Sequence, residues 1–408
     1  MLSILIVFAL LNTGKWLINF ISTPYEPIDF RGCYLSAEAY WNGMDPYSYE
    51  DQKKLWEPIQ SENHDWKMIE NGVYSTPLYP PQFVAFFGLY SLLSFKVAIW
   101  LQWILNIFAI GLIIWSISKL NQNLSVKYIV LGIMAFRGTW YALDTGQPML
   151  QVFALAMYVL VLIERKNLSL LPGLLLGFIS FKYTLLIPFG LYLLYKKEYK
   201  IVSIWIGLSV LLNAILLILD MNAQTHIQSW LNSMQLMNNY LHQDISNNGL
   251  AIIATSISIP VSQLFKISES VSSGPFMILV RIILPLVPFV FIWMYRKKFT
   301  WQYLIFISSL CSICFGHHLI YDVLTLISLR LISIDKNSSI SSLEFTLLIL
   351  LVIPLGKLVE ISHINQLHFL PAVYLFFYFI VQVIRIIKHQ NLPILNTEIE
   401  NKSIEQDR

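Results

Sequence analysis

A small number of polar side chains interrupt the long apolar stretches of this sequence, and these are its candidates for chemistry. Asp29 follows the first apolar segment by a few residues, which would place its carboxylate near the surface of a membrane. A carboxylate held there can act as a general base toward a hydroxyl group. The alternative is a solvated loop residue or a helix cap. Asp45 is the rival base, although Pro46 after it indicates a rigid turn.

Two more polar positions lie where apolar segments begin. Tyr79 opens a Tyr-Pro-Pro run at the point where a long polar stretch ends. Gln147 lies in Asp-Thr-Gly-Gln-Pro, a tight turn between two apolar segments. Its amide could hydrogen-bond a hydroxylated ligand, or the segment could be a turn and nothing more. Tyr79, Gln147 and Asp45 are therefore predicted to contact a hydroxyl-bearing ligand.

Lys182 stands in the middle of an otherwise apolar stretch between Leu170 and Tyr195. An ammonium group in a membrane costs about 3 kcal/mol or more unless it is paired. A phosphate group is a natural partner for it. The alternative is that the long side chain extends toward the interface and meets water there.

A histidine pair, His317 and His318, lies near the end of a late apolar segment, with Asp322 one turn further on. Adjacent residues point to different helix faces, whereas His318 and Asp322 share one. A zinc site would need a third ligand, and none is near in the sequence, so we predict no metal and no cofactor. A histidine here could bind an anion, or it could serve helix packing. Cys311 and Cys314 lie in an apolar run and are predicted to be packing residues.

The composition of the chain predicts the class of fold that positions these residues. The chain has 408 residues, of which 56% are hydrophobic and 12% are charged, with a mean hydropathy of +0.61. Soluble domains carry about 25% charged residues, because water must cover their surface. We therefore predict an all-α, polytopic transmembrane helical bundle in contact with membrane lipid. The net charge of +3 gives no reason to expect a nucleic-acid partner.

Apolar stretches approaching the roughly 20 residues of a spanning helix mark the candidate spans. The first, Leu2 to about Ile21, lacks a basic start and a cleavage site, so we interpret it as a retained helix. Residues 79–95 are short and open with prolines, which predicts a segment at, or re-entering, the outer face. About twelve helices are predicted: the first one and 97–118, 127–143, 149–163, 169–181, 183–195, 201–219, 276–295, 302–316, 319–334, 343–361 and 368–387.

Basic residues accumulate in cytoplasmic loops, and this rule orients the bundle. With the N-terminus inside, the long segments 22–77 and 220–275 become extracytoplasmic loops of a membrane domain covering 1–390. Residues 391–408 form a polar cytoplasmic tail. The inner side then collects Lys119, Lys127, Arg165, Lys166, Lys196, Lys197, Lys200, Arg296, Lys297, Lys298, Arg330, Lys336, Arg385 and Lys388.

The polar motifs occur in an order that resembles glycosyltransferase family 87, membrane mannosyltransferases of the GT-C class. The resemblance covers roughly Asp29 to Asp322. Each motif alone is weak, and it is their order that carries the resemblance. The motifs are Y-x-x-A-x-A and G-x-D-P-Y between Tyr34 and Tyr47, Y-P-P from Tyr79, G-Q at Gln147, two glycines before Lys182, and N-x-G-L from Asn247.

The resemblance implies an inverting transfer of a sugar, mannose in this family, from a polyprenyl-phosphate donor. The acceptor would be a hydroxyl of a lipid-linked or cell-surface glycan, on the extracytoplasmic side of the plasma (inner) membrane. It also implies that the acid in the first outer loop, here Asp29, is the base. His317 or His318 would lie near the donor phosphate, where the residues themselves already suggest Lys182. Asp45, Tyr79, Gln147 and Asp322 would then contact the sugar or the acceptor.

Two other functions fit a membrane bundle with internal polar residues. A lipid-linked oligosaccharide flippase or transporter would show two similar halves and polar groups near the bilayer midplane. Here the polar groups gather toward one face, beside both long loops. A glycan polymerase or ligase would also use a polyprenyl carrier, and the sequence leaves it open.

Overall fold

The computed structural model describes residues 2–22, 27–61, 79–165, 170–242, 286–315, 322–333 and 370–387. Every regular element in these ranges is a helix, as the sequence predicts. In the first half of the chain the helices are α1 (Leu2–Ser22), α2 (Ile28–Trp41), α3 (Tyr49–Ser61), α4 (Pro81–Phe87), the 3-10 helix η2 (Gly88–Leu92), α5 (Phe95–Leu120), α6 (Val126–Ala135), α7 (Arg137–Asp144) and α8 (Met149–Glu164). In the second half they are α9 (Leu171–Phe178), η3 (Ser180–Lys182), α10 (Tyr183–Tyr195), α11 (Tyr199–Leu219), α12 (Ala223–His242), η6 (Arg296–Lys298), α16 (Trp301–Phe315), α17 (Val323–Ser333) and α20 (Leu370–Ile387).

Two helices of the described ranges, α5 and α11, are long and apolar enough to cross a membrane. With 26 and 21 residues they are roughly 39 and 32 Å long at 1.5 Å per residue. Only 6% of the apolar stretch of α11 is buried against the rest of the chain, so water would meet a wholly apolar surface there. The protein is therefore associated with a membrane. Among the described residues, no other helix passes this test of length and hydropathy, and the count of about twelve spans stays a prediction.

A hydrophobic core joins the central helices. Helix α5 packs on α8, α9 on α11, and α10 on α16, with α17 and α20 against α16. Aliphatic side chains of α5, α8 and α16 fill the interior, which is what their almost uninterrupted apolar sequences require. Cys311 and Cys314 are fully buried in α16, as packing residues should be. A second cluster joins α2 and α4 to the start of α5.

The structure departs from the predicted elements in three places. Segment 22–77, expected to be a long loop, contains α2 and α3, and segment 220–275 begins with α12. The predicted span 127–143 is broken at Phe136, whose backbone is extended. The side chains of Thr139 and Trp140 donate hydrogen bonds to the carbonyl oxygens of Ile133 and Met134. They thereby satisfy groups that the break would leave without partners.

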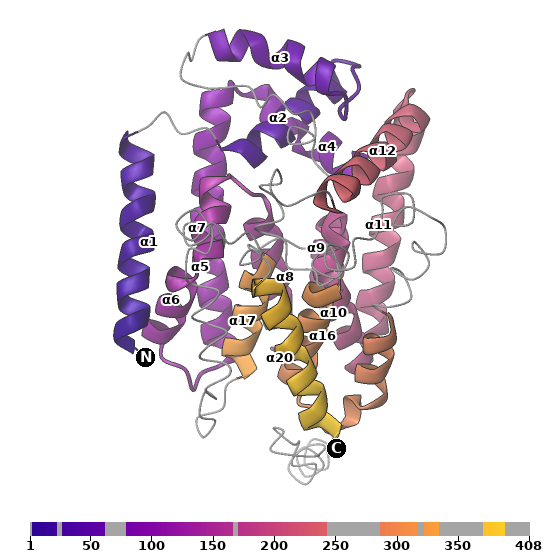
Figure 1. Cartoon of the computed structure of the whole chain (residues 1–408). Helices are drawn as coiled ribbons and strands as arrows, with labels where there is room; N and C mark the ends of the chain where they lie inside the picture. Colours follow the sequence, from indigo (N-terminus) through magenta and orange to yellow (C-terminus); the bar gives the residue numbers. More distant parts are fainter. Residues whose placement is uncertain are drawn as a thin grey trace.

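Figure 1 shows how these elements are arranged. Helices α2, α3 and α4 lie at one end of the bundle, and α12 crosses the end of α11 on the same side. The N-terminus of α1 and the C-terminal end of α20 lie at the opposite end. Predicted segments 343–361 and 391–408, with most of 220–275, lie outside the described residues.

Candidate active site

Asp29 occupies the first turn of α2, just after Pro27. An acidic residue is favourable there because the helix N-terminus is positive. The next side chain, Phe30, is fully buried among Phe87, Tyr90 and Phe95, with ring centroids 5.4–5.9 Å away. This packing fixes the start of α2, and with it the position of the Asp29 carboxylate.

The turn between α7 and α8 reaches the same point. The backbone N–H of Phe30 donates to the carbonyl oxygen of Thr145 at 3.0 Å. Gly146 has φ +68°, and a Cβ there would lie 2.7 Å from that of Phe30 and 2.9 Å from that of Pro27. Only glycine suits both this backbone conformation and this approach. The turn therefore docks directly on the N-terminus of α2.

Gln147, placed by this turn, contacts two other candidate residues. Its Nε2 donates to Oδ2 of Asp29 at 2.5 Å, and its Oε1 accepts from the Tyr79 hydroxyl at 3.2 Å. Tyr79 precedes α4, and its ring packs on Phe83. The polar tip of Tyr79 thus sets the amide orientation that Asp29 requires.

The Lys182 ammonium lies over the Tyr79 ring, with Nζ 5.6 Å from the ring centroid. Helix α9 ends before it and α10 begins after it, so Lys182 stands at a break between two apolar helices. Its Nζ is 3.7 Å from Oδ2 of Asp322, whose side chain is fully buried. The lysine side chain is 16% exposed, so the ammonium group is partly accessible from outside.

These surroundings decide the ionisation of Asp29. Burial raises the pKa of Asp29 above its ordinary value. Hydrogen bonds from Thr145 and Gln147 and the charge of Lys182 act in the opposite direction, because they favour the carboxylate. Burial also raises the pKa of Tyr79 well above its usual range, so its hydroxyl stays protonated. A raised pKa makes the ionised carboxylate a stronger base toward a hydroxyl proton.

The structure thus brings together five of the eight residues that the sequence singles out: Asp29, Tyr79, Gln147, Lys182 and Asp322. His317 and His318 lie outside the described residues. Asp45 serves another contact. Its Oδ2 accepts from the Ser229 hydroxyl of α12 at 2.6 Å, and its Oδ1 accepts from the Tyr47 backbone at 2.9 Å.

Sequence reasoning did not single out the residues behind the turn. Gln102, on α5, is fully buried, and its Nε2 donates to the carbonyl oxygen of Gly146 at 2.9 Å. The signal was present, since Gln102 and Asn106 are amides one turn apart in a 26-residue apolar helix. Thr145 lies in the Asp-Thr-Gly-Gln-Pro turn, and the sequence alone does not indicate its hydrogen bond to Asp29.

A groove adjoins the site between α4, η3, α11 and α12. Its volume is about 290 Å³, and its wall includes Pro80, Phe181, Leu217 and Trp230. Pro80 and Phe181 are the sequence neighbours of Tyr79 and Lys182, which do not themselves line the groove.

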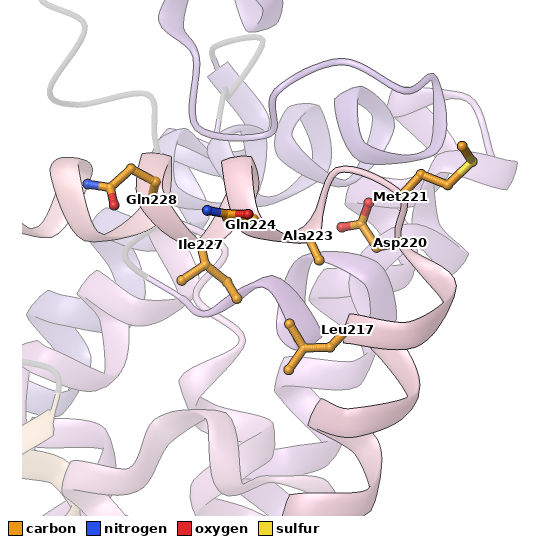
Figure 2. A pocket seen from close by; sticks show the side chains of 7 residues that line it. All are labelled: Leu217, Asp220, Met221, Ala223, Gln224, Ile227 and Gln228. Carbon is orange, nitrogen blue, oxygen red and sulfur yellow. The ribbon is translucent and has the colours of Figure 1, made fainter.

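A second hollow, of about 480 Å³, continues over the corner between α11 and α12 (Figure 2). It shares Leu217, Asp220 and Ile227 with the first. Among the described residues, no three His, Cys, Asp or Glu side chains could hold a metal ion, and the expectation of a metal-free reaction stays untested.

Comparison with known proteins gives one match. The model of glycosyltransferase family 87 matches residues 78–320, more than half of the chain. The matched range contains Tyr79, Gln147 and Lys182, whereas Asp29 precedes it and Asp322 follows it. No curated protein and no solved structure matches this chain.

Proposed function

The chain belongs to glycosyltransferase family 87, and we propose that it moves mannose from a polyprenyl-phosphate donor to a glycan hydroxyl. The acceptor is a lipid-linked or cell-surface glycan, and the transfer inverts the anomeric centre. The enzyme is a multi-pass protein of the plasma (inner) membrane, with its active site on the extracytoplasmic face. The hydrogen bond between Gln147 and Asp29, beside Lys182, is the observation that carries this proposal.

The distribution of charge along the bundle supports this orientation. Lys119 ends α5, Arg330 lies in the last turn of α17, and Arg385 lies in the last turn of α20. The C-terminal end of α20 is at the end opposite α2, α3 and α12 (Figure 1). Basic residues favour the cytoplasmic side, which leaves Asp29 and Gln147 on the outer side.

Asp29 is the general base of the proposed reaction. The acceptor hydroxyl attacks the anomeric carbon of the donor sugar while Asp29 takes its proton. The bond between that carbon and the phosphate oxygen breaks, and polyprenyl phosphate leaves with the electron pair. Gln147 holds the carboxylate oxygen that does not take the proton, which keeps the base aimed at the acceptor.

Lys182 binds the donor phosphate, together with a histidine of the 317–318 pair. The negative charge on the phosphate grows as the bond breaks, and a nearby ammonium stabilises it. The contact between Lys182 and the buried Asp322 holds the ammonium in place between α9 and α10. Tyr79 contacts both parts of the site, because its ring lies under the Lys182 ammonium and its hydroxyl donates to Gln147.

The groove supports a lipid-borne substrate. It is lined mainly by apolar side chains, among them Pro80 and Phe181, the sequence neighbours of Tyr79 and Lys182. It runs along the outer end of α11, where Leu219 is 72% exposed. A hydrocarbon chain can therefore lie in it while its phosphate reaches Lys182.

The experiment uses the purified chain in liposomes with polyprenyl-phosphate [14C]mannose and membrane glycolipids as acceptors. Labelled glycolipid should form, and it should not form with the Asp29→Asn variant. Polyprenyl-phosphate glucose serves as the competing donor and tests the choice of mannose. If the labelled donor only crosses the bilayer and no glycosidic product appears, the protein is a flippase and the proposal is wrong.

A further inference from the structure

Gln102 makes three side-chain hydrogen bonds inside an apolar helix. Its Nε2 donates to the carbonyl oxygen of Gly146 at 2.9 Å. Its Oε1 accepts from the Tyr90 hydroxyl at 2.7 Å and from Nε2 of Gln151 at 3.0 Å. An amide buried in an apolar helix is costly unless its polar atoms are paired, and such residues commonly serve function.

We propose that Gln102 is a positioning residue for the pair formed by Asp29 and Gln147. This inference rests on the proposed function, in which Asp29 is the base. Gln102 contacts the turn between α7 and α8 from α5 and does not line the groove. It therefore acts through the backbone of Gly146. Its task is to fix the turn that aims the Gln147 amide.

The geometry explains why a glutamine is needed here. Backbone hydrogen bonds hold the N–H groups of the turn, because Gly146 donates to the carbonyl oxygen of Leu143 at 3.2 Å and Gln147 donates to that of Ala142 at 2.9 Å. The carbonyl oxygen of Gly146 takes its hydrogen bond from the side chain of Gln102. The amide of Gln102 could rotate and present oxygen instead of nitrogen to that carbonyl. Tyr90 and Gln151 prevent this, because both donate to Oε1 and leave Nε2 for Gly146.

The consequence reaches Asp29 in two steps. Gly146 is followed directly by Gln147, so a shift of the turn moves the Gln147 amide away from the carboxylate. The other groups that interact electrostatically with the Asp29 carboxyl are the Lys182 ammonium, the hydroxyls of Thr145, Tyr79 and Tyr141, and the Cys33 thiol. If the hydrogen bond from Gln147 is weakened, it lowers the pKa of Asp29 less, and burial raises that pKa further. The carboxylate form is then less stable.

The test compares Gln102→Leu and Gln102→Met with Gln382→Leu. Gln382 is a matched control, because it is also a buried glutamine of an apolar helix whose Oε1 accepts from a tyrosine hydroxyl, that of Tyr303 at 2.9 Å. It lies on α20, away from the turn. Gln102→Met keeps the length and flexibility of the side chain if leucine packs badly.

Two quantities are measured on each purified variant. The first is the turnover number and the donor Michaelis constant in liposomes. The second is the titration of the Asp29 carboxyl group by difference infrared spectroscopy, with Asp29→Asn identifying its C=O band. The titration needs no substrate, so it tests the positioning role even if Asp29→Asn proves active and the proposed function fails.

Both Gln102 variants should lose turnover by about 10- to 100-fold with little change in the donor Michaelis constant, as expected for misplaced catalytic geometry. Their Asp29 titration should move to higher pH, whereas Gln382→Leu should leave turnover and titration unchanged. Wild-type turnover and titration in the Gln102 variants would overturn the inference. So would failure of both variants to fold beside a folded Gln382→Leu, because Gln102 would then serve packing alone.

Discussion

The amide of Gln147 lies between two residues that come from different parts of the chain. It donates to the Asp29 carboxylate, 118 positions earlier, and accepts from the Tyr79 hydroxyl, 68 positions earlier. An amide held at both ends cannot rotate without losing a hydrogen bond. Asp29 therefore meets a donor of fixed orientation at its Oδ2.

The first prediction concerns Asp29 itself. Asp29→Asn keeps the size of the side chain and removes the base, so the transfer rate should fall by about 10²–10⁴-fold. Thermal stability should change little, because burial already disfavours the charge. The measurement is turnover in liposomes together with the apparent melting temperature.

Asp45→Asn is the matched control, since Asp45 contacts Ser229 and lies apart from Gln147. It should retain turnover. Wild-type turnover in Asp29→Asn with an inactive Asp45→Asn would make Asp45 the base. If neither substitution matters, the assignment of a carboxylate base in the first outer segment is wrong.

The second prediction concerns pH. A base must be ionised to work, so activity falls as pH drops through the pKa of Asp29. Burial raises this pKa, which moves the acidic limb of kcat/KM above the ordinary aspartate value of about 3.9. A pH series with wild type and Gln147→Leu measures it. Because Gln147 stabilises the carboxylate, its loss should move the limb to still higher pH. A limb that stays in place in Gln147→Leu would contradict this role.

The sequence predicts the helical class and most helix boundaries, because hydrophobic periodicity and length are local properties. Segment 183–195, for example, coincides with α10. Local hydropathy could not reveal α2, whose sequence is too polar on average to resemble a span. Its buried residues, such as Arg31 and Ser36, are covered by other outer elements. Such coverage depends on tertiary contacts that a single sequence does not show.

The candidate site was predictable to the extent that polar residues in apolar surroundings are expensive. This principle selects Lys182 and Gln147, and it could have selected Gln102. It does not reveal which carboxylate meets which amide. Asp29 and Asp45 are both candidate bases in the sequence. The docking of Gly146 on Phe30 brings Gln147 to Asp29, whereas Asp45 contacts Ser229.

The third prediction concerns Lys182. Lys182→Met removes the charge and should mainly raise the donor Michaelis constant, because a phosphate contact contributes to donor binding. It also leaves Asp322 buried without its cation, which could cost about 3–5 kcal/mol of stability. The double variant Lys182→Met with Asp322→Asn should therefore recover stability but not donor binding. Lys196→Met, which breaks a 3.0 Å pair with Glu164, is the control.

Lys196→Met should leave the donor Michaelis constant unchanged, since Lys196 follows α10 at the end opposite Lys182. His318→Ala completes the series. An unaltered donor Michaelis constant in both Lys182→Met and His318→Ala would show that neither residue binds the donor phosphate.

The fourth prediction concerns topology. Lys197 is an exposed position after α10, on the proposed cytoplasmic side, whereas Met221 is fully exposed just before α12 on the proposed outer side. A cysteine at Met221 should react with a membrane-impermeant reagent in intact cells, and one at Lys197 should react only after permeabilisation. The three native cysteines are buried and give a low background. Strong labelling at Lys197 in intact cells would reverse the proposed orientation.

The last prediction separates two reasons for a glycine at position 146. Gly146 and Gly43 have nearly the same backbone conformation, with φ of +68° and +70°. A Cβ at Gly43 would meet nothing within 4 Å, whereas one at Gly146 would press on Phe30 and Pro27. Gly43→Ala should therefore cost about 1 kcal/mol of stability through the backbone alone.

Gly146→Ala should cost more, because the turn must also move away from α2. That movement should separate Gln147 from Asp29 and lower turnover by about 10-fold or more, whereas Gly43→Ala keeps turnover. Chemical denaturation and liposome turnover of both variants measure the two effects. Equal losses of stability, with turnover preserved in Gly146→Ala, would mean that the contact between the turn and α2 is not needed to aim the base.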